Sequence, residues 1–525
     1  MSSDSIRPTS RLTAVALLIL LLAGCVRPGP GAAELPESSG AASSPQPSVA
    51  AVEPTSSAPL SAQLGTPVPE YAGQPTPDAP HHEANAATAG TTGTHTVVAG
   101  ESLGQLAQRY GTTIEELVAL NGLTNADVIQ VGQALQVPGV EIQQVISPDF
   151  KIIPDSELVY GPAARDFDTR AFVTGLGGYL LQHTEEVEGQ TMDGPAILQL
   201  VADRHSVNPR LLLAVLEHEA GWVTQANPAP RSPLLGYSGT SAPTLYSQLS
   251  WAANTLNLGY YGRSEGGLRS FNLGDTTQVL FAPTINDGTA GVQRLLAAKD
   301  GVTEASWRED AGPDGFNATY TRLFGNPFGY TFEPILPSDL TLPVLELPWP
   351  AGETWYYTGG PHGAWNSGSA WGALDFVPPS EQVGCIQSDA WVTAMADGVV
   401  TRSGHGAVVV DLDDESGQAD GYAGTGWAIT YMHLETRDRA ALGQRVHTGD
   451  RLGHPSCEGG FSNGTHLHIT RSYNGRWISA DGERPFEMSG WVSSGAGAEY
   501  DGYLTRGEIV RGACVCREEV NAVSQ

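Results

Sequence analysis

Basic residues are scarce in this chain. It has 27 Lys and Arg residues against 57 Asp and Glu residues, which gives a formal net charge of −30 at pH 7. A surface of this sign repels phosphate backbones and anionic lipid head groups, so nucleic-acid partners are not expected. Hydrophobic residues make up 40% of the 525 residues and charged residues 16%. The composition indicates a soluble globular protein, and the length predicts about two to four domains.

A long apolar run is also missing at the N-terminus. The run Leu12–Leu22, preceded by Arg7 and Arg11, is too short to span a bilayer comfortably and is typical of a secretory signal. The run leads into Leu-Ala-Gly-Cys25, which resembles the lipobox of bacterial lipoproteins. That resemblance implies cleavage before Cys25, lipidation of its thiol and a membrane anchor without a transmembrane helix. An ordinary secretory signal with an incidental cysteine is the alternative, and both interpretations predict export.

Cysteine is rare, with five residues in the chain. Export places thiols in an oxidising compartment, and removal of Cys25 from the count leaves four cysteines with three possible pairings. The sequence does not choose among them. We favour a Cys385–Cys457 disulfide, which leaves Cys514 and Cys516 to each other or to another partner.

Aromatic residues are nearly absent from residues 26–93, which are rich in Ser, Ala, Pro, Gly and Thr. Such a segment buries too little apolar area to offset the entropy of ordering, so we expect a flexible tether. The predicted divisions of the chain are a signal peptide (1–24), a linker (25–94), a small α/β domain (95–139), a mostly helical middle domain (140–344), a β-sheet domain (345–495) and a C-terminal tail (496–525).

The residues 95–138 predict a strand, two helices and a second strand. Thr113 is a good N-cap for the second helix, and Gly122 follows its end. The unit resembles a LysM domain over its whole length, at Val97, Gly100, Glu101, Ser102, Leu103, Ala107, Tyr110, Ile114, Leu117, Asn121, Ile129, Gly132, Gln133, Leu135, Val137 and Pro138. The resemblance implies binding of N-acetylglucosamine-containing glycans such as peptidoglycan, in a groove that includes Gly100, Ser102, Leu103 and Ile129. A spacer of the same fold is the alternative.

The middle domain shows helical periodicity at 194–205, 208–222, 250–261 and 288–301. Around Glu219, the sequence Leu-Glu-His-Glu-Ala-Gly-Trp weakly resembles the catalytic helix of lysozyme-like lytic transglycosylases. The resemblance implies that Glu219 is a general acid. The usual downstream Gly-Leu-Met-Gln-type segment is absent, and no second carboxylate is identifiable. A structural or substrate-binding helical domain is therefore the favoured interpretation.

From Leu345 onward the pattern becomes that of β structure. Strands are predicted within 391–404, 407–413, 427–435, 444–454 and 465–471, and they form an antiparallel sheet of at least five strands. We expect the acidic run Asp411–Glu415 to be a solvated hairpin, and His405, His447 and His454 to lie at the surface.

Five residues of this β region are candidates for chemistry. Asp375 stands at the end of a predicted strand, and His362 precedes it by thirteen residues. His433 lies in an apolar strand. His466 and His468 are two apart in a strand, so their side chains share one face. Two histidines and one aspartate suit a zinc site that keeps a position open for water.

These residues and their frames resemble the M23 family of zinc metallopeptidases. The matching segments are Gly-Gly-Pro-His362, Leu-Asp375-Phe, Tyr-Met-His433-Leu, Gly-Asp-Arg-Leu-Gly-His-Pro-Ser and Gly-Thr-His466-Leu-His468. Most members have a short His-x-x-x-Asp spacing, whereas Trp371 stands four residues before Asp375 here. The longer spacing resembles the β-lytic subgroup. The resemblance implies that His362, Asp375 and His468 bind Zn²⁺, and that His433 and His466 serve proton transfer and the oxyanion.

The sequence thus predicts a lipid-anchored zinc endopeptidase that cuts peptide cross-links of bacterial peptidoglycan. No His-Glu-x-x-His motif is present, so a glutamate base on a helix is not expected. The alternatives are a non-hydrolytic wall-binding lipoprotein with an inactive M23 fold and a bifunctional hydrolase with a glycan-cleaving middle domain.

Overall fold

The computed structural model describes residues 92–97, 102–110, 112–123, 129, 133–138, 143–240, 242–273, 277–380, 382–414 and 416–525. The predicted signal segment, Cys25 and almost all of the linker lie outside these residues. Within them, no helix has the length and apolar character needed to cross a bilayer.

Residues 92–138 form the strand-helix-helix-strand unit that the sequence predicts. β1 (Thr92–Thr96) pairs antiparallel with β2 (Ala134–Pro138), and α1 (Leu103–Arg109) and α2 (Ile114–Asn121) lie between them in the chain. Thr113 caps α2 in a capping box with Glu116, and Gly122 ends the helix in the left-handed conformation at φ 61°. The buried core of this unit is small and consists of Val97, Leu103, Leu106, Ala107, Leu117, Leu135 and Val137.

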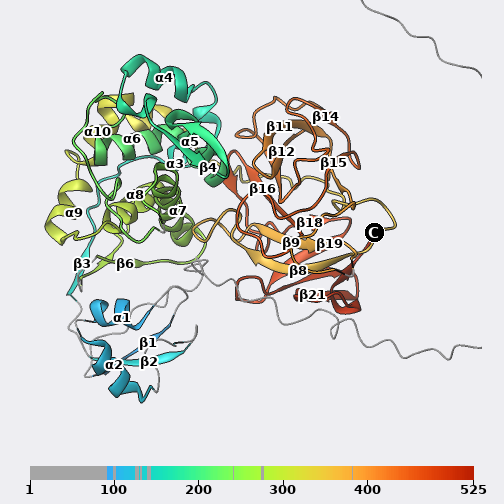
Figure 1. Cartoon of the computed structure of the whole chain (residues 1–525), viewed down its shortest axis with the longest axis horizontal. Coiled ribbons are helices and arrows are strands. Elements are labelled where there is room, and N and C mark those ends of the chain that lie inside the picture. The colour runs from blue at the N-terminus through green and yellow to red at the C-terminus, as the bar shows by residue number, and fades with distance from the viewer. Residues whose placement is uncertain are drawn as a thin grey trace, which may run out of the picture. The chain divides into compact units, whose positions relative to one another are not determined.

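The middle domain is mostly helical (Figure 1). Its helices are α3 (Asp155–Leu158), α4 (Thr169–Leu176), α5 (Gly194–His205), α6 (Pro209–Ala220), α7 (Leu245–Ser264), α8 (Asp287–Ala297), α9 (Glu304–Asp310) and α10 (Phe316–Phe324). Two small sheets accompany them, one of β3 (Gln143–Ile146), β6 (Ser270–Asn272) and β7 (Thr277–Leu280), the other of β4 (Thr184–Val187) and β5 (Gln190–Asp193). The four predicted helical stretches correspond to α5–α8, whereas the short helices and strands escaped prediction.

Local capping signals explain why α5 and α6 were predictable. Asp193 accepts a hydrogen bond from the N–H of Ala196 at the start of α5, and Ser206 ends the helix at φ 49°.

α7 and α8 pack closely through glycines, since a Cβ on Gly259 would lie 2.7 Å from Cα of Gly291. These helices enclose one large apolar core.

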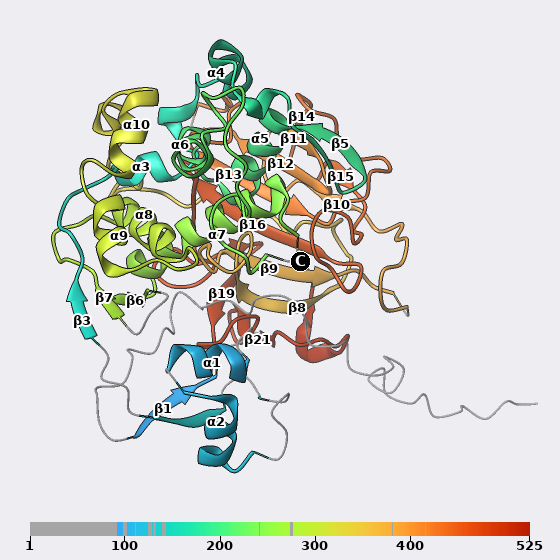
Figure 2. The same cartoon turned by 60° about the vertical axis from the view of Figure 1, so that its left-hand side comes forward.

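The C-terminal region is built on an antiparallel sheet whose strand order is β14-β11-β12-β13-β16-β9-β8-β22, with β17 added beside β16. Figure 2 shows β16, β9 and β8 side by side. The bounds are β8 (Trp355–His362), β9 (Ala373–Val377), β11 (Gly398–Gly404), β12 (Ala407–Leu412), β13 (Trp427–Met432), β14 (Arg445–Val446), β16 (Leu467–Tyr473), β17 (Arg476–Trp477) and β22 (Ala522–Val523). β10 (Val392–Thr393) and β15 (Arg451–Gly453) form a separate pair. The predicted antiparallel sheet is therefore present.

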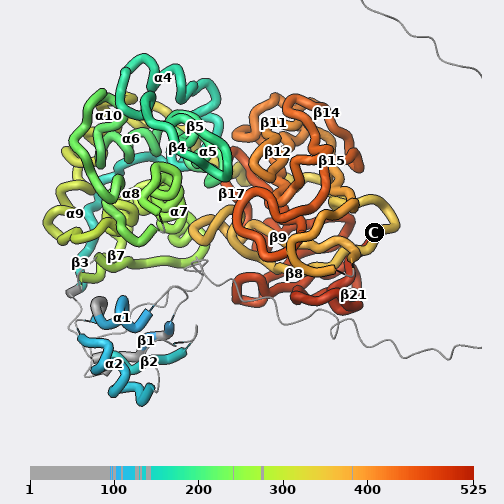
Figure 3. The backbone as a smooth tube through the Cα atoms, viewed as in Figure 1, coloured from blue at the N-terminus to red at the C-terminus, as the bar shows by residue number. Residues whose placement is uncertain are grey.

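The segment 496–525, expected as a tail, is folded. β20 (Gly502–Arg506) and β21 (Ile509–Gly512) continue a sheet that begins with β18 (Glu487–Met488) and β19 (Trp491–Gly495). β22 then pairs with β8. Figure 3 shows the red C-terminal tube beside β8. The strands are two to five residues long, which is too short for a clear alternating pattern in the sequence.

Two surface expectations for the β region were wrong. Asp411 is buried at 2% exposure, because it lies in β12, and its Oδ2 accepts a hydrogen bond from the N–H of Gly421 at 2.8 Å. His454 is also 2% exposed, and its ring packs against Trp391 at a centroid distance of 3.9 Å. In contrast, His447 is exposed as expected.

Candidate metal centre

Three strands bring the predicted ligands together. His468 in β16 lies directly opposite Asp375 in β9, and Asp375 lies opposite Gly359 in β8. The β8–β9 register shifts twice between Tyr357 and His362, which carries His362 at the end of β8 to the same site. Gly359 leaves room for the carboxylate, since a Cβ there would lie 2.7 Å from Oδ2 of Asp375.

The three potential ligand atoms have the spacing of a zinc site. Nε2 of His362 lies 3.1 Å from Nδ1 of His468 and 3.3 Å from Oδ1 of Asp375. Nδ1 of His468 lies 3.1 Å from the same carboxylate oxygen. Ligands in tetrahedral positions at about 2.0–2.1 Å from zinc are separated by roughly 3.3 Å. The triangle of donors therefore fits one zinc ion and leaves a fourth position free.

Backbone carbonyls orient both ligand rings. Nδ1 of His362 donates to the carbonyl of Gly360 at 2.7 Å, and Nε2 of His468 donates to the carbonyl of Ala364 at 3.1 Å. Each ring thus keeps its proton on the outer nitrogen and directs a lone pair inward. Oδ1 of Asp375 is buried and accepts no hydrogen bond from the described residues. Three inward-facing acceptors are a donor set for a cation.

Burial and neighbouring charges set the protonation of this group. Burial by itself raises the pKa of Asp375, but the adjacent His362 and His466 hold the pKa of that carboxyl well below its usual range. Burial lowers the pKa of His468, which favours its neutral, ligating form. For His362, the nearby carboxylate of Asp375 outweighs burial and raises the pKa.

The two remaining histidines, His433 and His466, lie beside the ligand triangle. Their ring centroids are 4.3 Å apart, and Nε2 of His466 lies 3.8 Å from Oδ1 of Asp375. Nδ1 of His433 donates to the carbonyl of Glu458 at 2.9 Å, and Nδ1 of His466 donates to that of Gly464 at 2.8 Å. Since Nδ1 of each ring is occupied by a carbonyl, Nε2 is the nitrogen that each ring can offer to a substrate.

The backbone at His433 differs from the expected strand. The residue lies just beyond β13 at φ 60°, in the left-handed region. Its carbonyl accepts hydrogen bonds from the N–H of Ser456 at 2.6 Å and from the hydroxyl of that residue at 2.9 Å. This turn directs the ring across β16 towards His466 and His468. Burial, followed by the charges of these two histidines, lowers the pKa of His433 well below its ordinary value, so the ring is a neutral proton acceptor.

The metal centre opens into a cavity of about 290 Å³. Its walls include Met432, Phe461 and Trp365, which give it an apolar character next to the polar centre. Tyr246, at the start of α7 in the middle domain, also lines it.

Glu499 and Tyr500 also line this cavity, and sequence reasoning missed them because they lie in the segment expected as a tail. The Tyr500 ring stacks on His362 at a centroid distance of 4.2 Å. Oε1 of Glu499 accepts a hydrogen bond from the N–H of Gly363 at 3.1 Å, and burial raises the pKa of this carboxyl to about 7. The only sequence signal is an acidic-aromatic pair in a Gly- and Ala-rich loop.

The disulfides follow the favoured pairing. Cys385 is bonded to Cys457, and Cys514 is bonded to Cys516. The first bond joins the segment before β10 to the loop that carries Phe461 on the cavity wall.

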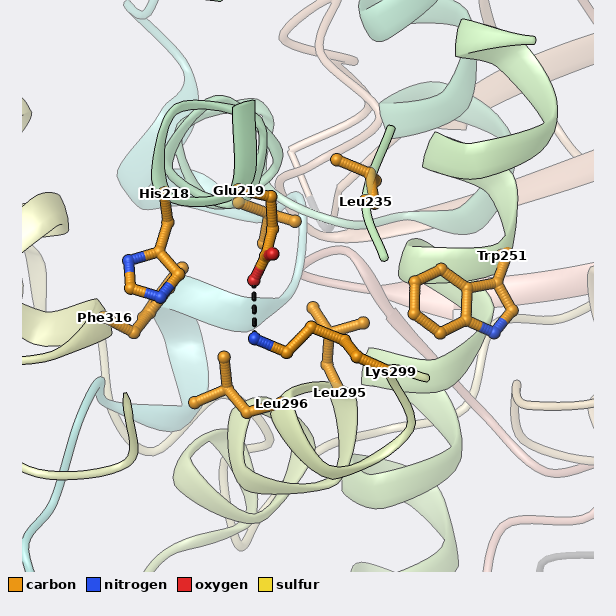
Figure 4. Close-up of a pocket in the computed structure, with 9 residues that line it drawn as sticks. His218, Glu219, Leu235, Trp251, Leu295, Leu296, Lys299 and Phe316 are labelled. Carbon is orange, nitrogen blue, oxygen red and sulfur yellow. Dashed lines mark hydrogen bonds and ion pairs between the residues drawn. The ribbon is translucent and has the colours of Figure 1, made fainter. Parts of the chain in front are cut away.

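Glu219 is in a different environment (Figure 4). Its side chain is 6% exposed and bound by two cations, Nζ of Lys299 at 2.8 Å and Nη2 of Arg231 at 2.7 Å. A general acid must reach the substrate, whereas Oε1 of Glu219 is occupied by Lys299 and Oε2 by Arg231. The adjacent cavity is about 10 Å³, the space of a single water molecule and too small for a sugar ring. These observations favour a structural role for Glu219.

The predicted glycan-binding residues lie in a partly described region. Gly100 is outside the described residues, Ser102 is exposed and Ile129 is half-buried. The side chain of Leu103 is 2% exposed and belongs to the small core, so only its backbone is available to a ligand.

Comparisons with known proteins agree with this organisation. Residues 95–138 match the family model described as LysM domain, and residues 151–335 match the model described as LasA, N-terminal domain. Over 375 residues the chain is 26% identical to protease LasA of Pseudomonas aeruginosa. This alignment covers 66% of this chain and 78% of that protein. It is 25% identical over 169 residues to the β-lytic metalloendopeptidase of Lysobacter enzymogenes, covering 31% of this chain and 86% of that protein. Among solved structures, the M23 metalloprotease pseudoalterin is 27% identical and matches 34% of this chain and all of its own, with a TM-score of 0.27.

Proposed function

We propose that this chain, an M23-type metallopeptidase with a LysM domain, is a zinc endopeptidase that hydrolyses peptide cross-links of bacterial peptidoglycan. The observation that carries the proposal is the set of three donor atoms, 3.1 to 3.3 Å apart, with two further histidines beside them. His362, Asp375 and His468 would hold the zinc ion, which supplies Lewis acidity when bound.

The roles of the other two histidines follow from their hydrogen bonds. His433 is neutral and carries its proton on Nδ1, so Nε2 accepts the proton of the attacking water. Nε2 of His466 lies 3.8 Å from Oδ1 of Asp375, at the edge of the ligand triangle. From this position the ring would stabilise the oxyanion as it forms, through a hydrogen bond from Nε2.

The remaining parts of the chain support an activity at the cell wall. The match of residues 95–138 to the LysM model supports glycan binding by this domain, with Gly100, Ser102, Leu103 and Ile129 near the ligand. The N-terminal sequence supports export, and lipidation of Cys25 would hold the enzyme at the membrane facing the wall. The relatives named as protease and metalloendopeptidase favour hydrolysis over an inactive scaffold.

The proposal is tested by zinc analysis and a digest of purified peptidoglycan. We expect about one zinc per chain in the wild type, and new peptide amino termini in the muropeptides after digestion. His468→Ala should lose both, while His447→Ala, which changes an exposed histidine in the same domain, should retain both. A wild-type protein without stoichiometric zinc that leaves the muropeptides unchanged would refute the proposal.

A further inference from the structure

The loop that precedes β16 connects a disulfide to one of the two non-ligand histidines. The loop of residues 457–464 begins at Cys457, which is bonded to Cys385, and ends two residues before His466. We propose that this disulfide activates the peptidase, because it fixes the 457–464 loop so that Ser462, a positioning residue, orients the His466 ring. This inference rests on the proposed peptidase activity and gives that activity a redox requirement.

Ser462 stands between the disulfide and the ring of His466. Its hydroxyl lies 3.4 Å from Sγ of Cys457, and its carbonyl oxygen lies 3.9 Å from Sγ of Cys385. The same hydroxyl lies 3.3 Å from Nδ1 of His466 and donates to the carbonyl of Gly464 at 2.7 Å. That carbonyl accepts the Nδ1 proton of His466 at 2.8 Å. Ser462 therefore contacts both sulfur atoms, the ring and the carbonyl that orients the ring.

The segment that carries Cys385 also supports this histidine through the backbone. Thr465, which precedes His466, donates its N–H to the carbonyl of Gly384 at 3.0 Å. The Thr465 hydroxyl donates to the carbonyl of Ile386 at 2.6 Å and accepts from the N–H of the same residue at 2.9 Å. Between β9 and β10 the described residues form no helix or strand, so the disulfide is a covalent constraint on an irregular segment.

The zinc ligands are held by other parts of the chain. The ring of His362 binds the carbonyl of Gly360, and the ring of His468 binds the carbonyl of Ala364. Both carbonyls lie in β8 or just after it, outside the 457–464 loop. Loss of the disulfide should therefore leave the donor set for zinc in place.

His433 has an anchor of its own. Its Nδ1 donates to the carbonyl of Glu458, at the start of the 457–464 loop. The carboxylate of Glu458 accepts hydrogen bonds from the N–H and the hydroxyl of Thr436 at 3.0 and 2.7 Å. These bonds fix this end of the loop without the disulfide, so the effect of the disulfide falls on His466.

The disulfide is open to thiol exchange. Cys385 is exposed and Cys457 is half-buried, and exposed disulfides are the ones that thiols reduce readily. After export, the bond forms by exchange with an oxidised dithiol. The two cysteine thiols lose two protons and two electrons, and the disulfide of the oxidant becomes two thiols. A chain that has not been oxidised would then bind zinc without efficient turnover.

The test measures zinc content and turnover before and after reduction with a water-soluble phosphine, because dithiols themselves bind zinc. The phosphine takes up the oxygen of water and becomes its oxide, while each cysteine gains a hydrogen. We expect kcat on dye-labelled peptidoglycan to fall about 10- to 50-fold, with KM within about threefold and about one zinc per chain. Re-oxidation with oxidised glutathione should restore kcat.

Three variants isolate the bond. The double variant Cys385→Ser and Cys457→Ser should behave like the reduced wild type under all conditions. The matched control is Cys514→Ser with Cys516→Ser, which lacks the other disulfide and should still lose turnover on reduction. In His466→Ala, reduction should cause no further loss, because the disulfide and the ring act on one contact.

Ser462→Ala tests the positioning role while the disulfide stays intact. We expect kcat to fall about 5- to 20-fold with KM and zinc content unchanged. Ser462→Thr keeps a hydroxyl and should recover most of the turnover. An unchanged kcat in Ser462→Ala, or loss of zinc in this variant, would overturn the role of Ser462.

A measurement that needs no hydrolysis separates this inference from the proposed function. Histidine rings react with diethyl pyrocarbonate, and mass spectrometry of peptides reports the rate at each ring. His466 is 9% exposed and His433 is 3% exposed. Reduction should speed the reaction of His466 about 5- to 10-fold and leave His433 slow, because only the turn around His466 opens. The exposed His447 gives the rate of a free ring in both states.

An unchanged rate at His466, an unchanged kcat after reduction, or loss of zinc together with kcat would overturn the inference. A protein that shows the expected change at His466 but hydrolyses no peptidoglycan when oxidised would refute the proposed function alone.

Discussion

The histidines of the site differ in which ring nitrogen binds a backbone carbonyl and which faces the ligand triangle. His466 and His468 are two positions apart, and sequence reasoning placed them on one face of a strand. In the structure, His468 binds a carbonyl through Nε2 and directs Nδ1 to the ligand triangle, whereas His466 binds a carbonyl through Nδ1 and turns Nε2 towards Asp375, 3.8 Å away. Residue spacing cannot reveal this difference, because it depends on carbonyls that the fold brings from elsewhere.

The clearest residue-level prediction for catalysis concerns His433. His433→Ala removes the proposed proton acceptor but none of the three ligand atoms. We expect zinc content to remain near one per chain and kcat to fall about 10²- to 10⁴-fold. Metal analysis and turnover measurements on the same preparation check this, and loss of zinc in this variant would assign His433 to the ligand set.

A second residue-level prediction concerns pH and stability. Burial, reinforced by the nearby Asp420, raises the pKa of Asp411 to about 7 in the folded chain. In the unfolded chain this pKa is about 3.9, so the folded state holds the proton more tightly. The stability contributed by the protonated form is complete below about pH 4 and is lost as the pH rises towards 7.

Asp411→Asn keeps the shape and the acceptor for Gly421 but cannot ionise. The variant should therefore unfold at the same temperature as wild type at pH 4 and at a higher temperature at pH 8. Calorimetry at both pH values checks this, with the exposed Glu483→Gln as the control that should show no such difference. A variant less stable than wild type at pH 8 would contradict the assignment.

At the scale of elements, the sequence predicted what is encoded locally. The helices α2, α5, α6 and α7 begin at side chains that cap them. α8 lacks such a cap, but like the others it lies close to its expected position. The grouping of His362, Asp375 and His468 was predictable from short motifs. The contributions of Glu499, Tyr500 and Tyr246 were not, because each depends on pairing between distant segments. Short strands such as β20 to β22 likewise gain their conformation from partners rather than from their own pattern.

The close approach of Gly359 in β8 to Asp375 in β9 gives a prediction at the scale of elements. Gly359→Ala would place a methyl group 2.7 Å from Oδ2 of Asp375, so the carboxylate has to move. We expect zinc affinity to fall about 10- to 100-fold, as for other changes that disturb the orientation of a ligand. Gly404→Ala in β11 is the control, because a Cβ there meets nothing within 4 Å. Competition with a zinc chelator measures both variants, and equal affinities would show that the close approach at Gly359 is not required.

At the scale of the whole molecule, the candidate metal centre lies where segments distant in the sequence meet. The loop after His362 is anchored in the middle domain, since the N–H of Gly368 donates to Oδ1 of Asn254. The C-terminal segment stacks Tyr500 on His362. This coupling could not be predicted, since the sequence shows only a change from helical to β texture near Leu345.

Metal removal should therefore affect stability as well as activity. A zinc ion bound only to the folded chain stabilises it, and its removal leaves three buried acceptors facing one another. We expect a chelator to abolish hydrolysis and to lower the unfolding temperature of the peptidase transition, and added zinc to restore both. Unfolding temperatures that are identical with and without chelator would show that these residues do not hold a metal.

The central claim is that His468 binds zinc while His466 serves the reaction. The most direct test measures zinc content and peptidoglycan hydrolysis side by side in His466→Ala and His468→Ala. We predict that His468→Ala loses both zinc and activity, whereas His466→Ala keeps about one zinc per chain and loses about 10²- to 10³-fold in kcat. Equal loss of zinc in the two variants, or retention of zinc by His468→Ala alone, would contradict this division.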